Sequence, residues 1–333
     1  MSAPGHGQAE PGVDFSVVLA TRNRGPLLER ALDSVLAQDG VALQVLVVDD
    51  GSEPAHAEQV AAAVARAAPR AQLLRLPARA AGHGPSFARN TGAAQARGRW
   101  IAFLDDDDHW ADRGHLARCM ASMSAGPQAA DLLFGNQRAL RADGSEHTGP
   151  LWLRALPLRG AADAQGAHEA PVADLLALGA MCHLNTTVIA RTLFEAIGGF
   201  DERMRYDEDR DLCLRAIDRA TRILYQPRAV GVHYVPDTTR SDNASTRLGA
   251  IDKRLAQLHM YDKAMISAHL PATRRYARHA KGQILRHVSS HLASAGRHQE
   301  AQRYRWQVLA TEFSAKWLAH TLIEGIRRSG ASA

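Results

Sequence analysis

An apolar run leads directly into four consecutive carboxylates at residues 101–108, Ile-Ala-Phe-Leu-Asp-Asp-Asp-Asp. The run predicts a buried strand, so the four carboxylates must gather where that strand leaves the core. Like charges at such a place repel one another unless a hard divalent cation, Mg²⁺ or Mn²⁺, balances them. The alternative is a solvated acidic turn that precedes the next helix. Taken alone, the motif leaves both interpretations open.

Strand and helix patterns alternate through the first hundred residues. Apolar runs predict strands at residues 15–20, 43–48, 71–76 and 100–104, and helical patterns predict helices at 26–37, 54–68 and 85–97. This alternation predicts an α/β fold with a mostly parallel sheet sandwiched by helices. Since the carboxyl ends of parallel strands meet at one edge, Thr21, the Asp49-Asp50 pair and residues 105–108 should converge there. For Asp49-Asp50-Gly51-Ser52, a glycine turn followed by a helix cap is the alternative.

The second half of the chain is less regular. Its patterns predict a helix at 116–123, strands at 131–134 and 184–190, a helix at 192–197 ended by Gly198-Gly199, and two short strands at 223–225 and 229–234 with Pro227 between them. Residues 141–172 have little pattern. A loop of that length is often functional when it is ordered.

Acidic residues cluster at the start of the helix predicted in the segment Asp207-Glu208-Asp209-Arg210-Asp211-Leu212. Their simplest explanation is that carboxylates are favourable at a helix N-terminus. Asp209, however, shares a helical stripe with Leu212, Cys213 and Ala216, at i+3, i+4 and i+7. This spacing predicts that its carboxylate points with the buried face, which favours a functional role.

Histidine and cysteine residues give weaker signals. His233 ends the last predicted strand, and its position alone favours a structural role; the acidic cluster is what raises a metal or phosphate role. The three cysteines, at positions 119, 182 and 213, show no Cys-x-x-Cys spacing. They therefore indicate neither a disulfide framework nor a zinc site, and a reducing cytoplasm fits them best.

Charge is distributed unevenly along the chain. The formal net charge is +5, and residues 247–333 hold 15 Lys and Arg against 5 Asp and Glu, which gives +10 there and −5 for residues 1–246. A basic tail suits a membrane surface or a polyanionic acceptor, although a solvated helical face is the commoner explanation. Residues from 248 onward have helical patterns, with an antiparallel pair at 285–309 that turns at Ala295-Gly296. The chain contains no signal-peptide core and no stretch of 18 apolar residues, so we expect a soluble protein.

Several motifs, taken together, carry a family resemblance. They are Ser16-Val-Val-Leu-Ala-Thr21-Arg-Asn23, Val47-Val-Asp49-Asp50-Gly-Ser52, Ala88-Arg89-Asn90-Thr-Gly92, Phe103-Leu-Asp105-Asp-Asp107-Asp108, Gly198-Gly-Phe200-Asp201-Glu202 and Glu208-Asp209-Arg-Asp211-Leu212. No single motif would suffice. In this order and at these spacings, the chain resembles a family 2 glycosyltransferase of the GT-A fold over roughly residues 14–236.

By position, the resemblance implies a role for each matching residue. The nucleotide sugar would be bound by Thr21, Arg22, Asn23, Asp49, Asp50, Arg89, Asp105 and Asp106. Asp107 would be the metal ligand, with Asp105 and His233 as further ligands, of which the histidine is the weakest match. Asp209 resembles the catalytic base. Asp108 is expected to begin a helix or to support a ligand without touching the metal.

The resemblance implies a metal-dependent, inverting transfer of a sugar from a nucleoside diphosphate, with UDP favoured, to an acceptor hydroxyl. Mn²⁺ or Mg²⁺ would act as a Lewis acid on the departing diphosphate, and a carboxylate would take the acceptor's proton. The helix N-terminus should keep Asp209 ionised at neutral pH. The setting would be bacterial-type surface polysaccharide or glycoconjugate synthesis, with a lipid-linked or polyanionic glycan as acceptor and no nucleic-acid partner. The protein would be cytoplasmic, with its basic helices able to contact the inner face of the membrane.

The expected domain organisation follows from the same reading. Residues 1–13 form a disordered tail and residues 14–240 the GT-A domain, with a nucleotide-sugar half at 14–108 and an acceptor half at 109–240 that includes a lid at 141–172. Residues 241–333 form a helical extension. A dinucleotide-dependent oxidoreductase is excluded because Thr21-Arg-Asn-Arg-Gly25 replaces its glycine-rich turn. An EF-hand is excluded because the acidic loop lacks its glycine and closing glutamate. A non-catalytic sugar-nucleotide-binding or scaffold protein of the same fold, with a basic docking tail, is the remaining alternative.

Overall fold

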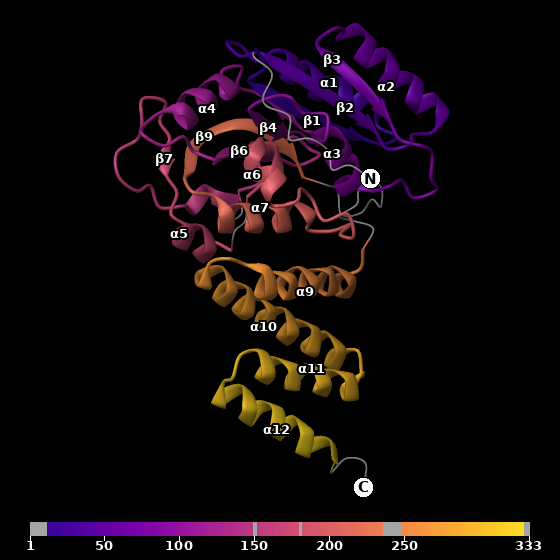
Figure 1. Ribbon diagram of the computed structural model, residues 1–333. Helices are drawn as coiled ribbons and strands as arrows, with labels where there is room; N and C mark the ends of the chain where they lie inside the picture. The colour runs from indigo at the N-terminus through magenta and orange to yellow at the C-terminus, as the bar shows by residue number, and fades with distance from the viewer. Residues whose placement is uncertain (1–11, 149–151, 180–181, 236–247, 330–333) are drawn as a thin grey trace, which may run out of the picture. The chain divides into compact units, whose positions relative to one another are not determined.

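The computed structural model describes residues 12–148, 152–179, 182–235 and 248–329. Most of the predicted tail, residues 1–11, therefore lies outside the described residues. The chain forms two compact units, Met1–Arg240 and Ser241–Ala333 (Figure 1). The first unit contains a sheet with helices on both faces, and the second unit is helical.

The first unit is built on one nine-stranded mixed sheet in the order β3-β2-β1-β4-β8-β6-β9-β5, with β7 beside β9. Neighbours are parallel from β3 to β4 and in the β6–β9 pair, whereas β8, β5 and β7 run antiparallel to their partners. The strands are β1 (Phe15–Thr21), β2 (Leu43–Asp49), β3 (Ala71–Arg75), β4 (Trp100–Phe103), β5 (His109–Trp110), β6 (Leu132–Leu140), β7 (His168–Glu169), β8 (Thr187–Ala190) and β9 (Ile223–Tyr234). The predicted mostly parallel α/β sheet is confirmed.

Successive side chains along a strand point to opposite faces of the sheet, and the two faces are covered by different helices. Val17 and Val45 belong to a buried cluster that also takes residues from α1, α2 and α4, so these helices cover one face of the sheet. Val18 and Val48 point the other way, toward α3. The helices of this unit are α1 (Gly25–Leu36), α2 (Pro54–Arg66), α3 (Pro85–Ala93), α4 (His115–Ser124), α5 (Val172–Ala177), α6 (Arg191–Ala196) and α7 (Glu208–Arg219).

Gly92 allows α3 to lie close to the sheet. A Cβ atom at this position would stand 2.5 Å from Cγ1 of Val18 and 3.0 Å from Cγ2 of Val48. Any side chain would therefore push the helix away from β1 and β2. The helix carries Arg89 toward the site, so this glycine fixes how near that guanidinium comes to the strand ends.

Four predicted elements differ clearly from the structure. The strand predicted at 131–134 is β6, which continues to Leu140. Helix α3 ends at Ala93 rather than at residue 97. The run predicted as a strand from residue 184 begins with a 3₁₀ turn, η2 (Leu184–Thr186), stabilised by the side-chain and main-chain atoms of His183. The two short strands predicted around Pro227 form one continuous strand, β9. The register of its pairing with β6 shifts on both sides of Asn136. At this irregularity Pro227, which has no N–H group, does not need to donate a hydrogen bond.

In residues 141–172, the segment with little sequence pattern, the described part contains regular elements and buried side chains. It contains a 3₁₀ turn, η1 (Trp152–Ala155), and the short strand β7. Leu153 and Leu156 in this segment are buried. Residues 149–151 lie outside the described residues.

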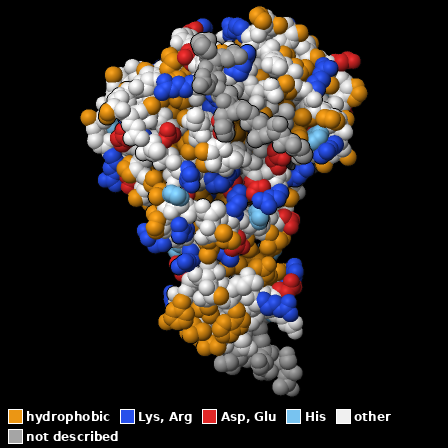
Figure 2. All heavy atoms as spheres, viewed as in Figure 1, with side chains coloured by type: hydrophobic (Ala, Val, Ile, Leu, Met, Phe, Trp, Pro, Cys, Tyr) orange, Lys and Arg blue, Asp and Glu red, His pale blue; other side chains and the backbone are white. Residues whose placement is uncertain are grey.

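The second unit consists, in its described residues, of α9 (Ala250–Ser267), α10 (Pro271–Ser294), α11 (His298–Thr311) and α12 (Ala315–Ser329). Gly296 has φ +76° at the predicted turn between α10 and α11. Hydrophobic side chains gather on the surface over α11 and α12 (Figure 2), and the exposed ones in this part include Trp306, Phe313, Leu322 and Ile323. Among the helices that the structure describes, none is long and apolar enough to cross a membrane.

Candidate functional site

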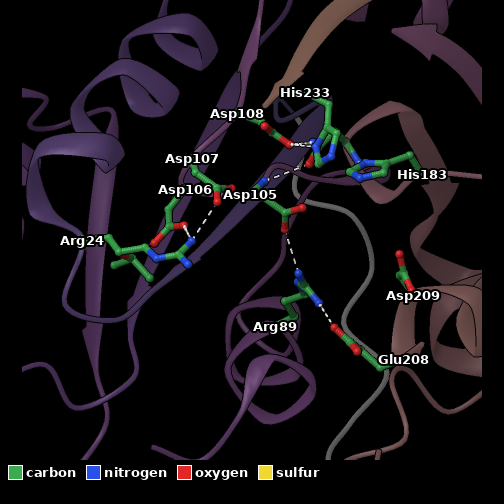
Figure 3. Close-up of polar contacts among 12 residues, drawn as sticks. Arg24, Arg89, Asp105, Asp106, Asp107, Asp108, His183, Glu208, Asp209 and His233 are labelled. Carbon is green, nitrogen blue, oxygen red and sulfur yellow. Dashed lines mark hydrogen bonds and ion pairs between the residues drawn. The ribbon is translucent and has the colours of Figure 1, made fainter. Parts of the chain in front are cut away.

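The four carboxylates after β4 do not share one environment. Asp106 is buried and accepts hydrogen bonds from Thr21 Oγ1 at 2.7 Å and from Arg24 Nη1 at 3.1 Å. Thr21 can reach it because β1 and β4 are paired neighbours whose carboxyl ends meet. The same Arg24 Nη1 lies 2.8 Å from Asp107 Oδ2 (Figure 3). One guanidinium therefore spans the two central carboxylates.

Asp105 and Asp107 have opposite electrostatic surroundings. Burial opposes ionisation of Asp105, but the Arg89 guanidinium, with His183 and His233 nearby, outweighs it and lowers the pKa of this carboxyl. Burial and the neighbouring carboxylates raise the pKa of Asp107 to about 7, with Arg24 opposing them. Negative charge at Asp107 is therefore poorly compensated by the protein's own cations.

Asp108 serves as a support at the end of the acidic loop. It is 1% exposed, and its Oδ2 accepts from His233 Nδ1 at 2.8 Å and from Asn185 Nδ2. Its Oδ1 accepts from the Tyr234 N–H at 2.8 Å. Both oxygens thus accept hydrogen bonds from protein donors.

Asp108, His183 and His233 offer potential ligand atoms that lie within 4.8 Å of one another. Hydrogen bonds distinguish the two imidazoles. His233 Nδ1 must donate to the carboxylate of Asp108, so the lone pair of the neutral ring is on Nε2. His183 Nδ1 accepts from the Asn185 N–H at 3.3 Å, so its neutral ring carries hydrogen on Nε2. Burial lowers the pKa of His183 to about 4, which keeps that ring neutral. Of the pair, His233 is the one suited to binding a metal.

Arg89 joins the acidic loop to the acidic start of α7. Its Nη2 lies 2.7 Å from Asp105 Oδ1, and its Nη1 lies 2.8 Å from Glu208 Oε1 (Figure 3). These two carboxylates outweigh burial and raise the pKa of the guanidinium, which stays charged. The bridge connects residues that are more than a hundred positions apart in the chain.

Asp209 follows Glu208 and is half-buried, with its carboxylate separate from the bridge in Figure 3. Burial, then the charges of Glu208 and Asp207, raise its pKa to about 7, against the opposing effect of Arg89. We expected the helix N-terminus to keep Asp209 ionised at neutral pH, and the structure opposes this by raising the pKa of the carboxyl group. Desolvation and two adjacent carboxylates outweigh the helix dipole at this position.

The other predicted nucleotide residues form the turns after β1 and β2. Asp49 pairs with Thr21 across the strands and accepts from the Ser52 N–H at 3.0 Å. Asn23, with φ +58°, bonds to Ser52 Oγ through its N–H at 2.9 Å, and its Oδ1 accepts from the Glu53 N–H at 2.8 Å. The two turns are therefore locked to each other.

Asp50 and Arg22 hold the loop before α3. Asp50 accepts from the N–H groups of His83 and Gly84, at 2.7 and 2.9 Å, and its Oδ1 lies 2.9 Å from His83 Nδ1. Arg22 Nη2 donates to the carbonyls of Arg79 and Ala80, both at 3.1 Å. The structure thus places both side chains against this loop, where they shape the neighbouring surface.

Four residues of the site were missed by sequence reasoning: Arg24, His183, Asn185 and Glu208. Arg24 and Glu208 stand beside predicted residues, so proximity in the sequence was a usable signal. His183 and Asn185 precede a strand and carry no motif of their own. Only the pairing of β8 with β4 brings them to the acidic loop.

Comparisons with known proteins bear on the family and the fold. The family model described as "Glycosyl transferase family 2" matches residues 16–147. The succinoglycan biosynthesis protein ExoO of Rhizobium meliloti is 30% identical over 289 residues, which cover 82% of this chain and 72% of ExoO. Among solved structures, S. aureus TarS in complex with UDP-GlcNAc superposes with a TM-score of 0.64 at 17% identity, covering 96% of this chain and 92% of that one. The mannosyltransferase PcManGT of Pyrobaculum calidifontis, in complex with GDP-Man and Mn²⁺, gives a TM-score of 0.54 at 19% identity, covering 96% of this chain and 86% of that one.

Proposed function

Because this chain belongs to glycosyltransferase family 2, we propose that it transfers a sugar from a nucleoside-diphosphate donor to an acceptor hydroxyl, with a divalent metal and with inversion at the anomeric carbon. Its relative ExoO is a succinoglycan biosynthesis protein, which supports a place in bacterial surface polysaccharide or glycoconjugate synthesis. The observation that carries the proposal is the Arg89 bridge, because it joins the acidic loop to the helix that bears Asp209. The leaving diphosphate and the general base act on opposite sides of the same sugar, so the residues that serve them must lie close together.

The donor is proposed to bind at the strand ends of β1, β2 and β4. The interlocked turns at Asn23 and Ser52 offer a rigid surface for the base and ribose, and Thr21 and Asp49 lie at its floor. UDP is the favoured nucleotide, and the complexes of TarS and PcManGT with UDP-GlcNAc and GDP-Man support a nucleotide sugar in general. The positive charge of Arg89 would lie near the diphosphate.

The donor types present, carboxylate oxygens and an imidazole nitrogen, fit a divalent cation, although among the described residues the ligand atoms that lie within 4.8 Å of one another belong to Asp108, His183 and His233. The raised pKa of Asp107 indicates that Arg24 only partly balances the carboxylates around it, and a hard cation would add positive charge there. Asp107, Asp105 and Nε2 of His233 would hold Mn²⁺ or Mg²⁺, and the Asp108 carboxylate would orient the imidazole. When bound, the metal would act as a Lewis acid that stabilises charge on the leaving diphosphate.

Asp209 is proposed to accept the proton of the acceptor hydroxyl as that oxygen attacks the anomeric carbon. The C–O bond to the diphosphate breaks as the new C–O bond forms, which gives one in-line displacement with inversion. A positioned base contributes typically about 10²- to 10⁴-fold. A pKa of about 7 suits this task, because the carboxylate is basic enough to take a proton and still substantially ionised at neutral pH.

The helical unit is proposed to contact an anionic membrane surface from the cytoplasmic side, where a lipid-linked acceptor would reside. Residues 247–333 carry a net +10, and Trp306 and Phe313 are exposed apolar side chains there. Basic charge combined with exposed aromatic residues supports peripheral binding. A non-catalytic scaffold of the same fold is the alternative, and turnover would exclude it.

The test is a donor screen followed by a turnover assay. Thermal shift with UDP, GDP, dTDP and CDP sugars, with and without Mn²⁺, should identify one donor, since a ligand at about 100 times its Kd stabilises by about 2.7 kcal/mol. Turnover with that donor should stop on addition of EDTA and return with Mn²⁺ or Mg²⁺. Asp209→Asn should bind the donor normally and lose transfer. Donor binding without turnover in the wild type, or turnover unchanged by Asp209→Asn, would contradict the proposal.

A further inference from the structure

The side chain of Asn185 lies between the two ends of the acidic loop. It is 2% exposed and comes from η2, the turn that precedes β8. Its Oδ1 accepts from the N–H of Asp105 at 2.9 Å, and its Nδ2 donates to Oδ2 of Asp108. Its carbonyl accepts from Trp110 Nε1 at 2.7 Å. Asn185 thus makes three hydrogen bonds to the segment that runs from Asp105, the first carboxylate of the acidic loop, to Trp110 in β5.

These contacts fix the orientation of the amide. The N–H of Asp105 can only donate, and the carboxylate of Asp108 accepts, so the amide oxygen and nitrogen cannot exchange places without losing both bonds. The loop is closed further by the N–H of Asp108, which donates to the carbonyl of Asp105 at 3.2 Å. Asp106 and Asp107 therefore project from a short loop whose two ends are held by one buried side chain.

The same amide also acts on the imidazole side of the site. Asp108 Oδ2 accepts from both Asn185 and His233 Nδ1, so the carboxylate is held between them. This arrangement sets the direction in which Nε2 of His233 points. Asn185 therefore links two proposed metal ligands that lie on different strands, Asp105 after β4 and His233 on β9.

We propose that Asn185 is a positioning residue that presets the metal site, an inference that rests on the proposed metal-dependent transfer. It aligns Asp105 directly and His233 through Asp108, without touching the metal itself. An amide is suited to this place because it offers one acceptor and one donor with no charge. A carboxylate would add a fifth negative group, and an apolar side chain would leave the N–H of Asp105 and an oxygen of Asp108 without this partner.

The experiment compares two variants with a control at Thr187, the first residue of β8. Asn185→Leu keeps the number and branching of the side-chain heavy atoms and removes both hydrogen bonds, and Asn185→Ala removes the side chain beyond Cβ. Thr187→Val is the control, because Thr187 is equally buried and its Oγ1 donates to the carbonyl of His183 at 2.8 Å rather than to the acidic loop. Binding of Mn²⁺ alone would be measured by isothermal titration calorimetry and by loss of the electron paramagnetic resonance signal of free Mn²⁺. The Tm of each protein would be measured by circular dichroism.

Loss of a group that orients metal ligands typically weakens metal affinity about 10- to 100-fold. We expect both Asn185 variants to raise the Kd for Mn²⁺ by this factor, and Thr187→Val to keep the wild-type Kd at a comparable change in Tm. The inference is overturned if both Asn185 variants bind Mn²⁺ as the wild type does, or if Thr187→Val weakens binding equally. A wild-type protein that binds no Mn²⁺ would overturn the proposed metal dependence, and the inference with it.

Discussion

The pH dependence of turnover reports on the surroundings of Asp209. Burial and the neighbouring carboxylates raise its pKa to about 7, from an ordinary value of 3.8. A general base works only when it is deprotonated, so kcat should rise with pH through this value and level off above it. A carboxyl group with an ordinary pKa would instead give a flat profile over the same range.

The size of the effect follows from the pKa. With a value of about 7, roughly half of the base is ionised at pH 7, about one eleventh at pH 6 and about ten elevenths at pH 8. The kcat at pH 6 should therefore be about tenfold below its plateau. With an unshifted carboxyl group, the loss at pH 6 would be about 1%.

The assay is kcat at saturating donor and saturating Mn²⁺. Saturating metal is needed because the pKa of Asp107 is also about 7, and a bound cation keeps that carboxylate ionised. Glu208→Gln removes a charge beside Asp209 and should move the midpoint of the profile to lower pH. Glu195→Gln makes the same change on α6, where the side chain pairs with Arg191, and should leave the midpoint unchanged.

Stability gives a second measure of the same pKa. Because the pKa of Asp209 is higher in the folded protein than its ordinary value, the folded state favours the neutral carboxyl group. The resulting contribution to stability is fully present below about pH 3.8 and is lost as pH rises through about 7. Asp209→Asn should therefore raise the Tm relative to wild type at pH 8 and much less at pH 5. A wild-type kcat that is flat from pH 6 to 8, or an unmoved midpoint in Glu208→Gln, would refute the reasoning.

Three further predictions concern the metal site and the core. Asp107→Ala should weaken Mn²⁺ binding at least about tenfold in a titration while leaving the Tm equal or higher, because it removes a half-buried carboxylate that its neighbours repel; unchanged binding would exclude this ligand. Asp108→Ala should lower kcat about 10- to 100-fold in a steady-state assay, because His233 loses the carboxylate that orients it; wild-type kcat would count against that role. Phe134→Ala should lower the free energy of unfolding, measured with urea, by about 3–5 kcal/mol, because this side chain is fully buried in β6. A decrease below about 1 kcal/mol would show that the surrounding core repacks to fill the cavity.

Much of the first unit was predictable because its signals are local. The apolar runs of β1, β2 and β4 and the helices between them follow from periodicity, and parallel pairing then brings the strand ends to one edge. The later elements were harder to predict. The irregular register of β9 at Pro227 and the 3₁₀ turn at Asn185 depend on which neighbours they pair with, and that information is not local.

The identity and order of the charged groups can be read directly from the sequence: four carboxylates after a strand, an acidic helix start and a basic C-terminal region. The electrostatic behaviour of each group depends on tertiary packing. Arg89 can bridge Asp105 and Glu208 only after α3 and α7 have packed beside the sheet. The pKa of Asp209 is the clearest case, because local position favours ionisation while burial and neighbours oppose it, and desolvation exists only in the folded chain.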